Sequence, residues 1–159
     1  MILPILLYGN KKLRKKNIKI YNNKNIIKII NNMFDTMYFY KGIGLAAPQI
    51  GKNINLFIIG IKNIKITVIN PKIIKYSKKN IISKEGCLSL PNIYEKIVRK
   101  ENILVKYYDY KWKKHIKKLY NILSIIFQHE YDHINGKLLI DYLSKKKKNK
   151  IKKKLNLLY

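Results

Sequence analysis

The residue types best suited to metal chemistry are rare in this chain and fall in two short segments. The only cysteine, Cys87, lies in the sequence Glu-Gly-Cys-Leu-Ser, and two of the three histidines, His129 and His133, are four residues apart. On a helix this spacing places both imidazole rings on one face, where they can bind one metal ion. One thiolate and two imidazoles make three protein ligands and leave one coordination position open, as in catalytic metal sites.

The residues around the first histidine indicate hydrolytic chemistry. Glu130 follows His129 directly and can reach the open coordination position. Histidines four apart with a glutamate beside the first are typical of helices that bind a hydrolytic metal ion. Residues 122–127 are mostly apolar, which favours a buried helix over one with two surface histidines. We therefore expect a catalytic metal site on this helix.

The third protein ligand is expected upstream of the helix. The long metzincin pattern would need a histidine at position 139, which is Leu139, and no glutamate follows Glu130 to complete the site of a zinc peptidase. Cys87 is the remaining candidate. The soft thiolate and the two imidazoles accept several divalent ions, so the ligand set alone does not name the metal.

Sequence periodicity predicts the elements that must position these residues. Apolar residues at helical spacing predict helices over residues 25–40, 121–134 and 141–158, with Asp141 as the cap of the last one. Segments rich in β-branched residues predict strands over residues 55–61, 64–70, 93–99 and 102–110, and residues 113–119 are expected to pair with the last of these. Pro71 is expected to end the strand at residue 70. Strands flanked by helices without regular alternation predict an α+β fold.

Length and composition are those of one folded domain, residues 1–159. Hydrophobic residues make up 47% of the 159 residues, which excludes a disordered chain. A single cysteine excludes an internal disulfide and fits a reducing compartment. The longest apolar stretches are too short to span a membrane, and the N-terminal segment lacks a signal-peptide pattern. We expect a cytoplasmic protein without a membrane partner.

The formal net charge of +27 has two interpretations. All but two of the 35 basic residues are lysine, and they are spread over the whole chain. Lysine, asparagine, isoleucine and tyrosine have codons rich in A and T, so a strongly biased genome accounts for most of this charge. The alternative is a protein that binds nucleic acid or another polyanion.

Three segments together resemble the signature motifs of the peptide deformylase family. They are Gly-Ile-Gly-Leu-Ala-Ala-Pro-Gln over residues 42–49, Glu-Gly-Cys-Leu-Ser over residues 85–89, and Gln-His-Glu-Tyr-Asp-His over residues 128–133. Their order and spacing also fit, and the resemblance extends from residues 13–14 to residues 141–144. The segment after Pro91, Asn-Ile-Tyr, is individual to this chain, and lysine dominates its charged surface positions.

The resemblance implies a fold and an activity. The implied fold has antiparallel β-sheets packed around a central metal-binding helix, with a C-terminal helix over about residues 141–158. The implied activity is metal-dependent removal of the formyl group from the N-terminal formyl-methionine of new polypeptides, which are the expected partners. The implied cofactor is one divalent ion. Fe²⁺ is the expected ion, and Zn²⁺, Ni²⁺ or Co²⁺ are the alternatives.

The resemblance also implies roles for individual residues. Cys87, His129 and His133 would bind the metal, whose bound water becomes acidic enough to supply hydroxide at neutral pH. Glu130 would move the proton, and the Gln49 side-chain amide and the Leu88 backbone N–H would stabilise the oxyanion. Substrate would lie against residues that could otherwise be plain core or turn positions: Ile43, Gly44, Gly86, Ile122, Ile125 and Ile126.

Two other functions remain as alternatives to this interpretation. An endopeptidase could use the same histidine helix, and it would cleave proteins without hydrolysing formyl-peptides. A basic RNA-binding module would not need the complete catalytic set that this sequence retains. The basic C-terminal helix could also contact the ribosome, although codon bias explains its lysines equally well.

Overall fold

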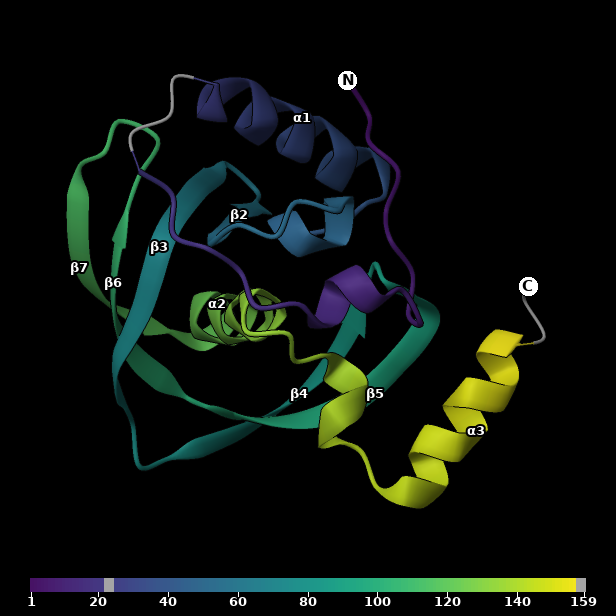
Figure 1. Ribbon diagram of the computed structural model, residues 1–159. Coiled ribbons are helices and arrows are strands. Elements are labelled where there is room, and N and C mark those ends of the chain that lie inside the picture. Colours follow the sequence, from purple (N-terminus) through teal and green to yellow (C-terminus); the bar gives the residue numbers. More distant parts are fainter. Residues whose placement is uncertain (22–24, 157–159) are drawn as a thin grey trace.

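The computed structural model describes residues 1–21 and 25–156, which form an α+β fold as predicted (Figure 1). The α-helices are α1 (Ile26–Phe39), α2 (Asn121–Ile134) and α3 (Lys145–Asn156), and the short 3₁₀ helices are η1 (Lys11–Arg14), η2 (Ala47–Ile50) and η3 (Leu139–Tyr142). The strands are β1 (Gly44–Ala46), β2 (Leu56–Ile61), β3 (Ile64–Tyr76), β4 (Asn80–Cys87), β5 (Leu90–Lys100), β6 (Asn102–Tyr108) and β7 (Lys114–Tyr120).

The strands of the described residues form two antiparallel sheets. Five strands pair in the order β1-β2-β3-β6-β7, while β4 and β5 form a separate hairpin. Helix α2 lies centrally in Figure 1 and contacts strands of both sheets. Phe127 on α2 meets Phe57 on β2 edge to face, with ring centroids 4.9 Å apart. The predicted central helix between antiparallel sheets is therefore confirmed.

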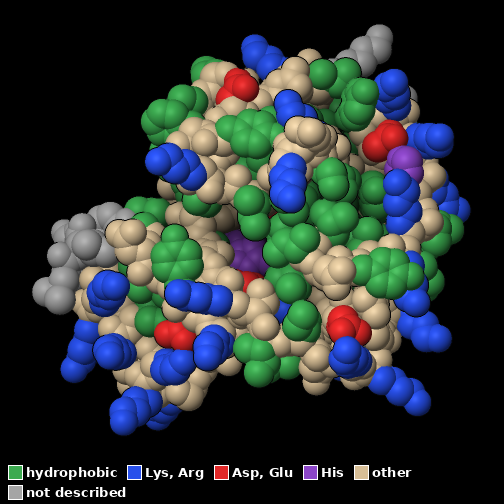
Figure 2. Space-filling model, turned by 180° about the vertical axis from the view of Figure 1, so that it is seen from behind, with side chains coloured by type: hydrophobic (Ala, Val, Ile, Leu, Met, Phe, Trp, Pro, Cys, Tyr) green, Lys and Arg blue, Asp and Glu red, His purple; other side chains and the backbone are tan. Residues whose placement is uncertain are grey.

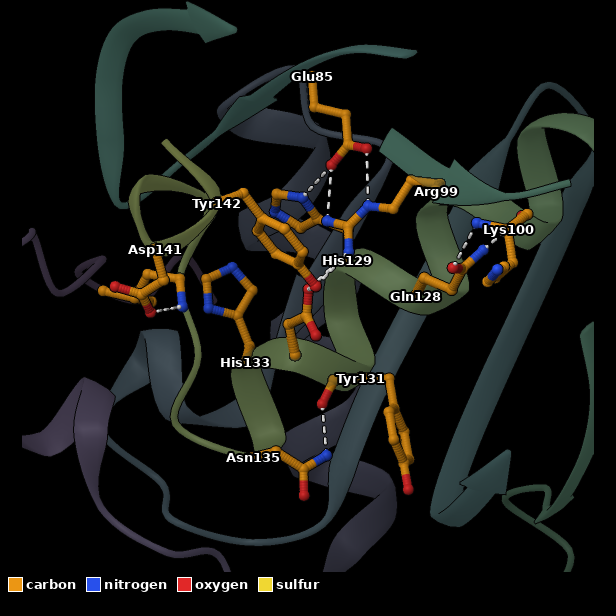
Figure 3. A network of polar contacts seen from close by, with 12 residues as sticks. Glu85, Arg99, Lys100, Gln128, His129, Tyr131, His133, Asn135, Asp141 and Tyr142 are labelled. Carbon is orange, nitrogen blue, oxygen red and sulfur yellow. Dashed lines mark hydrogen bonds and ion pairs between the residues drawn. The ribbon is translucent and has the colours of Figure 1, made fainter. Parts of the chain in front are cut away.

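The position of α2 is fixed by apolar packing and by one buried amide. Ile126, Phe127 and Ile134 pack in the core against the five-stranded sheet. Gln128 accepts a hydrogen bond from the backbone N–H of Lys100 (3.0 Å) and donates one to the carbonyl of Lys100 (2.8 Å), as Figure 3 shows. These bonds tie the middle of α2 to the end of β5, at the residue directly before His129.

The predicted end of the strand over residues 64–70 is wrong. Pro71 does not end a strand, because β3 continues to Tyr76 and pairs with β6 along its second half. The pairing register shifts between Ile69 and Lys72, and Asn70 has a positive φ of 49°. This irregularity leaves Pro71 outside the regular ladder, where its missing N–H is not needed.

Two other elements differ from the sequence expectation. Strand β4 was not predicted, because its polar and glycine residues hide the alternation of a half-exposed hairpin. Helix α3 begins at Lys145, not at Asp141, which belongs to η3. Asp141 is not the cap of α3: its carboxylate binds Arg14 and accepts a hydrogen bond from the N–H of Leu138. The end of the predicted helix at residues 157–158 lies outside the described residues.

The remaining helices pack through the apolar residues that the sequence marks. The buried side of α1 carries Ile26, Ile30, Met33 and Met37, which join a cluster with β1 and β2. Helix α3 contributes Ile151 and Leu155 to a second cluster with η3 and β5. Across the described residues, no helix combines the length and the apolar character needed to cross a membrane.

Candidate active site

Helix α2 and the end of β4 bring the three predicted metal ligands together. His129 and His133 are one turn apart on α2, with ring centroids separated by 5.1 Å. Cys87 is the last residue of β4, and its Sγ lies 3.3 Å from Nε2 of His133. One ligand atom from each of the three residues lies within 4.8 Å of the others. The geometry therefore permits all three to bind one ion.

The ring nitrogens of the two histidines and the sulfur of Cys87 are suitable ligands for a divalent metal ion. Nδ1 of His129 is bonded to a carboxylate oxygen of Glu85 at 2.9 Å, so the opposite ring nitrogen remains available as a ligand. His133 is almost completely buried. Burial lowers the pKa of its imidazole well below the usual value, which favours the neutral form that binds metals. Imidazole and thiolate are ligand types that zinc and other transition metals accept.

His129 is bonded through Glu85 to a buried network of charged side chains. Arg99 donates two hydrogen bonds to the carboxylate of Glu85, both 2.8 Å, and Figure 3 shows this carboxylate joining Arg99 to His129. Arg99 also bonds Asp132 at 2.6 Å and the hydroxyl of Tyr142 at 3.0 Å. Burial alone would raise the pKa of Glu85, but the bonds from Arg99 and His129 outweigh it and lower that pKa. Arg99 therefore forms ion pairs with both Glu85 and Asp132.

Glu130 lines the same site, and its carboxyl group is buried with one oxygen unpartnered. It is 4% exposed, and its Oε2 has no hydrogen-bond partner among the described residues. Burial raises the pKa of this carboxyl group to about 7. Such a group can both accept and release a proton near neutral pH.

Gln49 is fixed in one orientation beside the ligands. Its carbonyl oxygen accepts a hydrogen bond from the N–H of Ala46 at 2.9 Å. Its amide nitrogen therefore faces the other way, 3.2 Å from Oγ of Ser89 and 3.7 Å from Sγ of Cys87. This buried amide presents a donor to the metal site.

A cavity of about 830 Å³ opens over these groups. Figure 2 shows it as a hollow with a histidine at its floor and hydrophobic side chains around it. Its wall includes every residue singled out from the sequence except His133: Ile43, Gly44, Gln49, Gly86, Cys87, Leu88, Ile122, Ile125, Ile126, His129 and Glu130.

The structure adds lining residues that sequence reasoning missed. Lys41, Lys84 and Tyr94 line the same cavity. Tyr94 belongs to β5, within the strand predicted over residues 93–99, and its ring covers Gly86 so closely that a Cβ there would lie 2.7 Å from it. Recognition of β4 as a strand would have pointed to Lys84, but its alternation pattern is too weak.

Comparisons with known proteins agree with this geometry. The sequence matches the polypeptide deformylase family over residues 2–149. The chain belongs to the polypeptide deformylase family. It is accordingly a metal-dependent hydrolase that removes the N-formyl group from the N-terminal formyl-methionine of newly synthesised polypeptides and releases formate. The resemblance seen in the three sequence motifs is thereby confirmed.

Bacterial deformylases are similar over nearly the whole chain. The peptide deformylase of Karelsulcia muelleri is 59% identical over 147 residues, which cover 89% of this chain and 78% of that protein. The crystal structure of the Legionella pneumophila enzyme superposes with a TM-score of 0.94 at 38% identity, covering 99% of this chain and 95% of the other. The Ehrlichia chaffeensis enzyme, solved in complex with actinonin, gives a TM-score of 0.94 at 33% identity, covering 97% of this chain and 95% of the other.

Proposed function

We propose that this cleft performs deformylation with one divalent ion held by Cys87, His129 and His133. The observation that carries the proposal is the buried carboxylate of Glu130, which lines the same cavity as Cys87 and His129. When bound, a divalent ion supplies a Lewis acid that activates water near neutral pH. Fe²⁺ is proposed as the native ion, with Zn²⁺, Ni²⁺ or Co²⁺ as substitutes, because thiolate and imidazole ligands accept each of them.

Glu130 is proposed to carry the proton of the reaction. Its pKa of about 7 lets the carboxylate accept a proton from the attacking water at neutral pH. The oxygen of that water adds to the formyl carbon, and the bond between this carbon and the amide nitrogen then breaks. The proton from Glu130 goes to the leaving nitrogen. The second proton of the water passes from the formic acid to the free amino group at neutral pH, so the products are formate and a polypeptide with a protonated amino terminus.

Gln49 and the backbone N–H of Leu88 are proposed to stabilise the charge that develops on the formyl oxygen. The bond from Ala46 to the Gln49 carbonyl supports this role, because it fixes the amide N–H₂ group before substrate arrives. Donors that need no rearrangement are the most effective at stabilising a developing oxyanion.

The apolar part of the cavity is proposed to bind the methionine side chain. Ile125 and Ile126 are buried in its wall, whereas Ile43 and Ile122 are each 47% exposed and would form its upper part. Gly44 and Gly86 would let the substrate backbone approach closely. Formyl-methionine and formyl-norleucine peptides should react at similar rates and formyl-aspartate peptides slowly; equal rates for all three would exclude this pocket.

The exposed side of α3 is proposed to contact ribosomal RNA near the exit of the nascent chain. Ile151 and Leu155 dock the helix on the enzyme, while Lys146, Lys150 and Lys153 are exposed. Contacts of lysine with phosphate release counterions and weaken steeply with salt. Such a contact would hold the enzyme where its substrates emerge, in the cytoplasm.

Co-sedimentation with ribosomes at low and moderate salt tests this contact. Glutamate at Lys146, Lys150 and Lys153 should abolish ribosome binding and leave activity on a short free peptide intact. A control with glutamate at Lys113, Lys114 and Lys117, exposed positions before and on β7, carries the same change in charge. Equal sedimentation of the two variants would mean that α3 has no special role and that its charge is compositional.

Residues 1–159 are proposed to work as one catalytic domain, since the family match over residues 2–149 includes both sheets and α2. The proposed chemistry is tested by anaerobic purification, metal analysis and formate release from formyl-Met-Ala-Ser. Chelation should abolish formate release, and Fe²⁺, Ni²⁺ or Zn²⁺ should restore it. Full activity after rigorous metal removal would contradict the metal role, and protein cleavage without formate release would indicate an endopeptidase.

A further inference from the structure

The exposed face of the β4–β5 hairpin leads into the cavity and carries two lysines opposite each other. Gly86 and Tyr94 are opposite each other in the hairpin register, and both line the cavity. The pair two residues further along is Lys84 and Lys96, and both side chains are exposed. Residues opposite each other in an antiparallel pair share one face, and like charges in this arrangement are destabilising.

No acidic side chain neutralises this lysine pair. Each of the eight acidic residues except Glu130 is engaged in an ion pair elsewhere. Within the described residues, none of these ion pairs includes Lys84 or Lys96. A similar opposed pair, Lys72 and Lys106, lies between β3 and β6, so what distinguishes Lys84 and Lys96 is their position beside the cavity.

The positive charge continues onto the wall of the cavity itself. Lys84 lines the cavity, and its Nζ lies 5.9 Å from the centroid of the Tyr94 ring. Lys41, in the connection between α1 and β1, lines the same cavity from another element. Figure 2 shows blue cationic side chains on both sides of the hollow that contains the histidine. The acidic residues of the lining are Glu85, which is bound by Arg99, and the buried Glu130.

We propose that the mouth of this cavity favours nascent polypeptides with an acidic side chain a few residues after the formyl-methionine. Lys84 and Lys96 lie two residues from the Gly86–Tyr94 pair, a distance of about 7 Å along a strand. A substrate that continues past this pair would bring its third or fourth side chain to the lysines. A carboxylate there relieves their repulsion and stabilises the complex. This inference rests on the proposed peptide site.

Kinetics on matched peptides test the preference. The kcat/KM of the metal-loaded enzyme is compared for formyl-Met-Ala-Glu-Ser and formyl-Met-Ala-Gln-Ser, and for the same exchange at the fourth position. We expect the glutamate peptide to be favoured by about two- to fivefold at low salt, the size of an exposed ion pair. The ratio should approach one at high salt, because exposed charges are screened. Ratios near one at both positions would overturn the inference.

Matched variants separate the effect of Lys84 and Lys96 on the peptide preference from the effect of the protein's overall positive charge. Lys84→Gln and Lys96→Gln should each lower the glutamate-to-glutamine ratio, and the double variant should bring it to about one. Lys117→Gln removes one exposed charge from β7, far along the other sheet, and should leave the ratio at its wild-type value. An equal fall in all three single variants would overturn the assignment to Lys84 and Lys96. Absence of formate release from every peptide would instead contradict the proposed function.

Discussion

Gly44 and Glu130 are so close that residue 44 has no room for a side chain. A Cβ at position 44 would lie 2.9 Å from Cδ of Glu130 and nearer still to its Oε1. Gly44 begins β1 and Glu130 lies on α2, so the contact joins the edge of the five-stranded sheet to the helix that carries the proposed catalytic glutamate. The glycine in the first motif is therefore explained by the glutamate in the third.

Gly44→Ala should lower kcat strongly while the protein still binds metal. The added methyl group must displace the Glu130 carboxylate or Ile126, and misplacing a catalytic group by about 1 Å can cost ~10² in rate. The measurement is formate release together with metal content and thermal unfolding. Unchanged kcat in a fully folded, metal-loaded variant would mean that the position of Glu130 is not critical.

Glu130→Gln should keep the metal and lose nearly all turnover. The amide has almost the same shape as the carboxylate but cannot accept the proton, and general acid–base catalysis typically contributes ~10²–10⁴-fold. Metal content should match that of the wild type, since Glu130 is not among the three ligands. A loss of metal equal to the loss of activity would assign Glu130 a structural role instead.

Gln49→Leu should lower kcat by ~10²–10³ with a smaller effect on KM, because an oxyanion donor acts mainly in the transition state. Its amide is already oriented by Ala46, so leucine removes the donor with little change in volume. Initial rates over a range of formyl-Met-Ala-Ser concentrations separate the two constants. A change confined to KM would show that Gln49 only binds substrate.

Glu85→Gln should weaken metal binding and destabilise the fold at the same time. The bond to Nδ1 of His129 orients a metal ligand, and loss of such a partner typically costs ~10–100-fold in metal affinity. Arg99 would stay buried with only part of its charge compensated, which predicts a loss of about 3 kcal/mol in the free energy of unfolding.

The control for Glu85 is Glu101, which forms an ion pair with the exposed Lys79. Glu101→Gln should cost less than about 1 kcal/mol, because exposed pairs contribute little. Urea unfolding and metal titration of both variants provide the comparison. Equal effects of the two substitutions would exclude a special role for the buried network.

The site was predictable from the sequence because its residue types are rare and their spacing is local. His129, Glu130 and His133 need only a helix to act together, and the apolar residues before them predict that helix with the observed bounds. Cys87 could be added by elimination. Strand β4 was not predictable in the same way, because its exposed positions carry Asn80, Ile82 and Lys84 and it ends in a glycine and a cysteine, which is no clear alternation; only its partner β5 was predicted, over residues 93–99. The partners of Arg99 come from three elements, with Glu85 on β4, Asp132 on α2 and Tyr142 on η3, and no local pattern encodes those contacts.

The ion pair between Asp141 and Arg14 makes the free energy of unfolding depend on pH. Asp141 holds η3 to η1 through Arg14, with Oδ1 2.9 Å from a guanidinium nitrogen, and accepts a bond from the N–H of Leu138. Burial would raise the pKa of Asp141, but these bonds outweigh it and lower that pKa below its usual 3.8. A lowered pKa means that the charged form stabilises the fold above that pH, and that this contribution disappears as the pH falls through the folded value.

Asp141→Asn should therefore cost up to about 1 kcal/mol at pH 7, a modest value because the pair with Arg14 is partly exposed. Asparagine keeps an acceptor for Leu138, so the variant isolates the effect of the charge. Urea unfolding of both proteins from pH 7 downward should show curves that converge as the pH falls through the folded pKa of Asp141, because the wild-type carboxyl then becomes protonated as well. A difference that stayed constant over the whole acidic range would mean that Asp141 stabilises the fold through shape and hydrogen bonding, and not through its ion pair with Arg14.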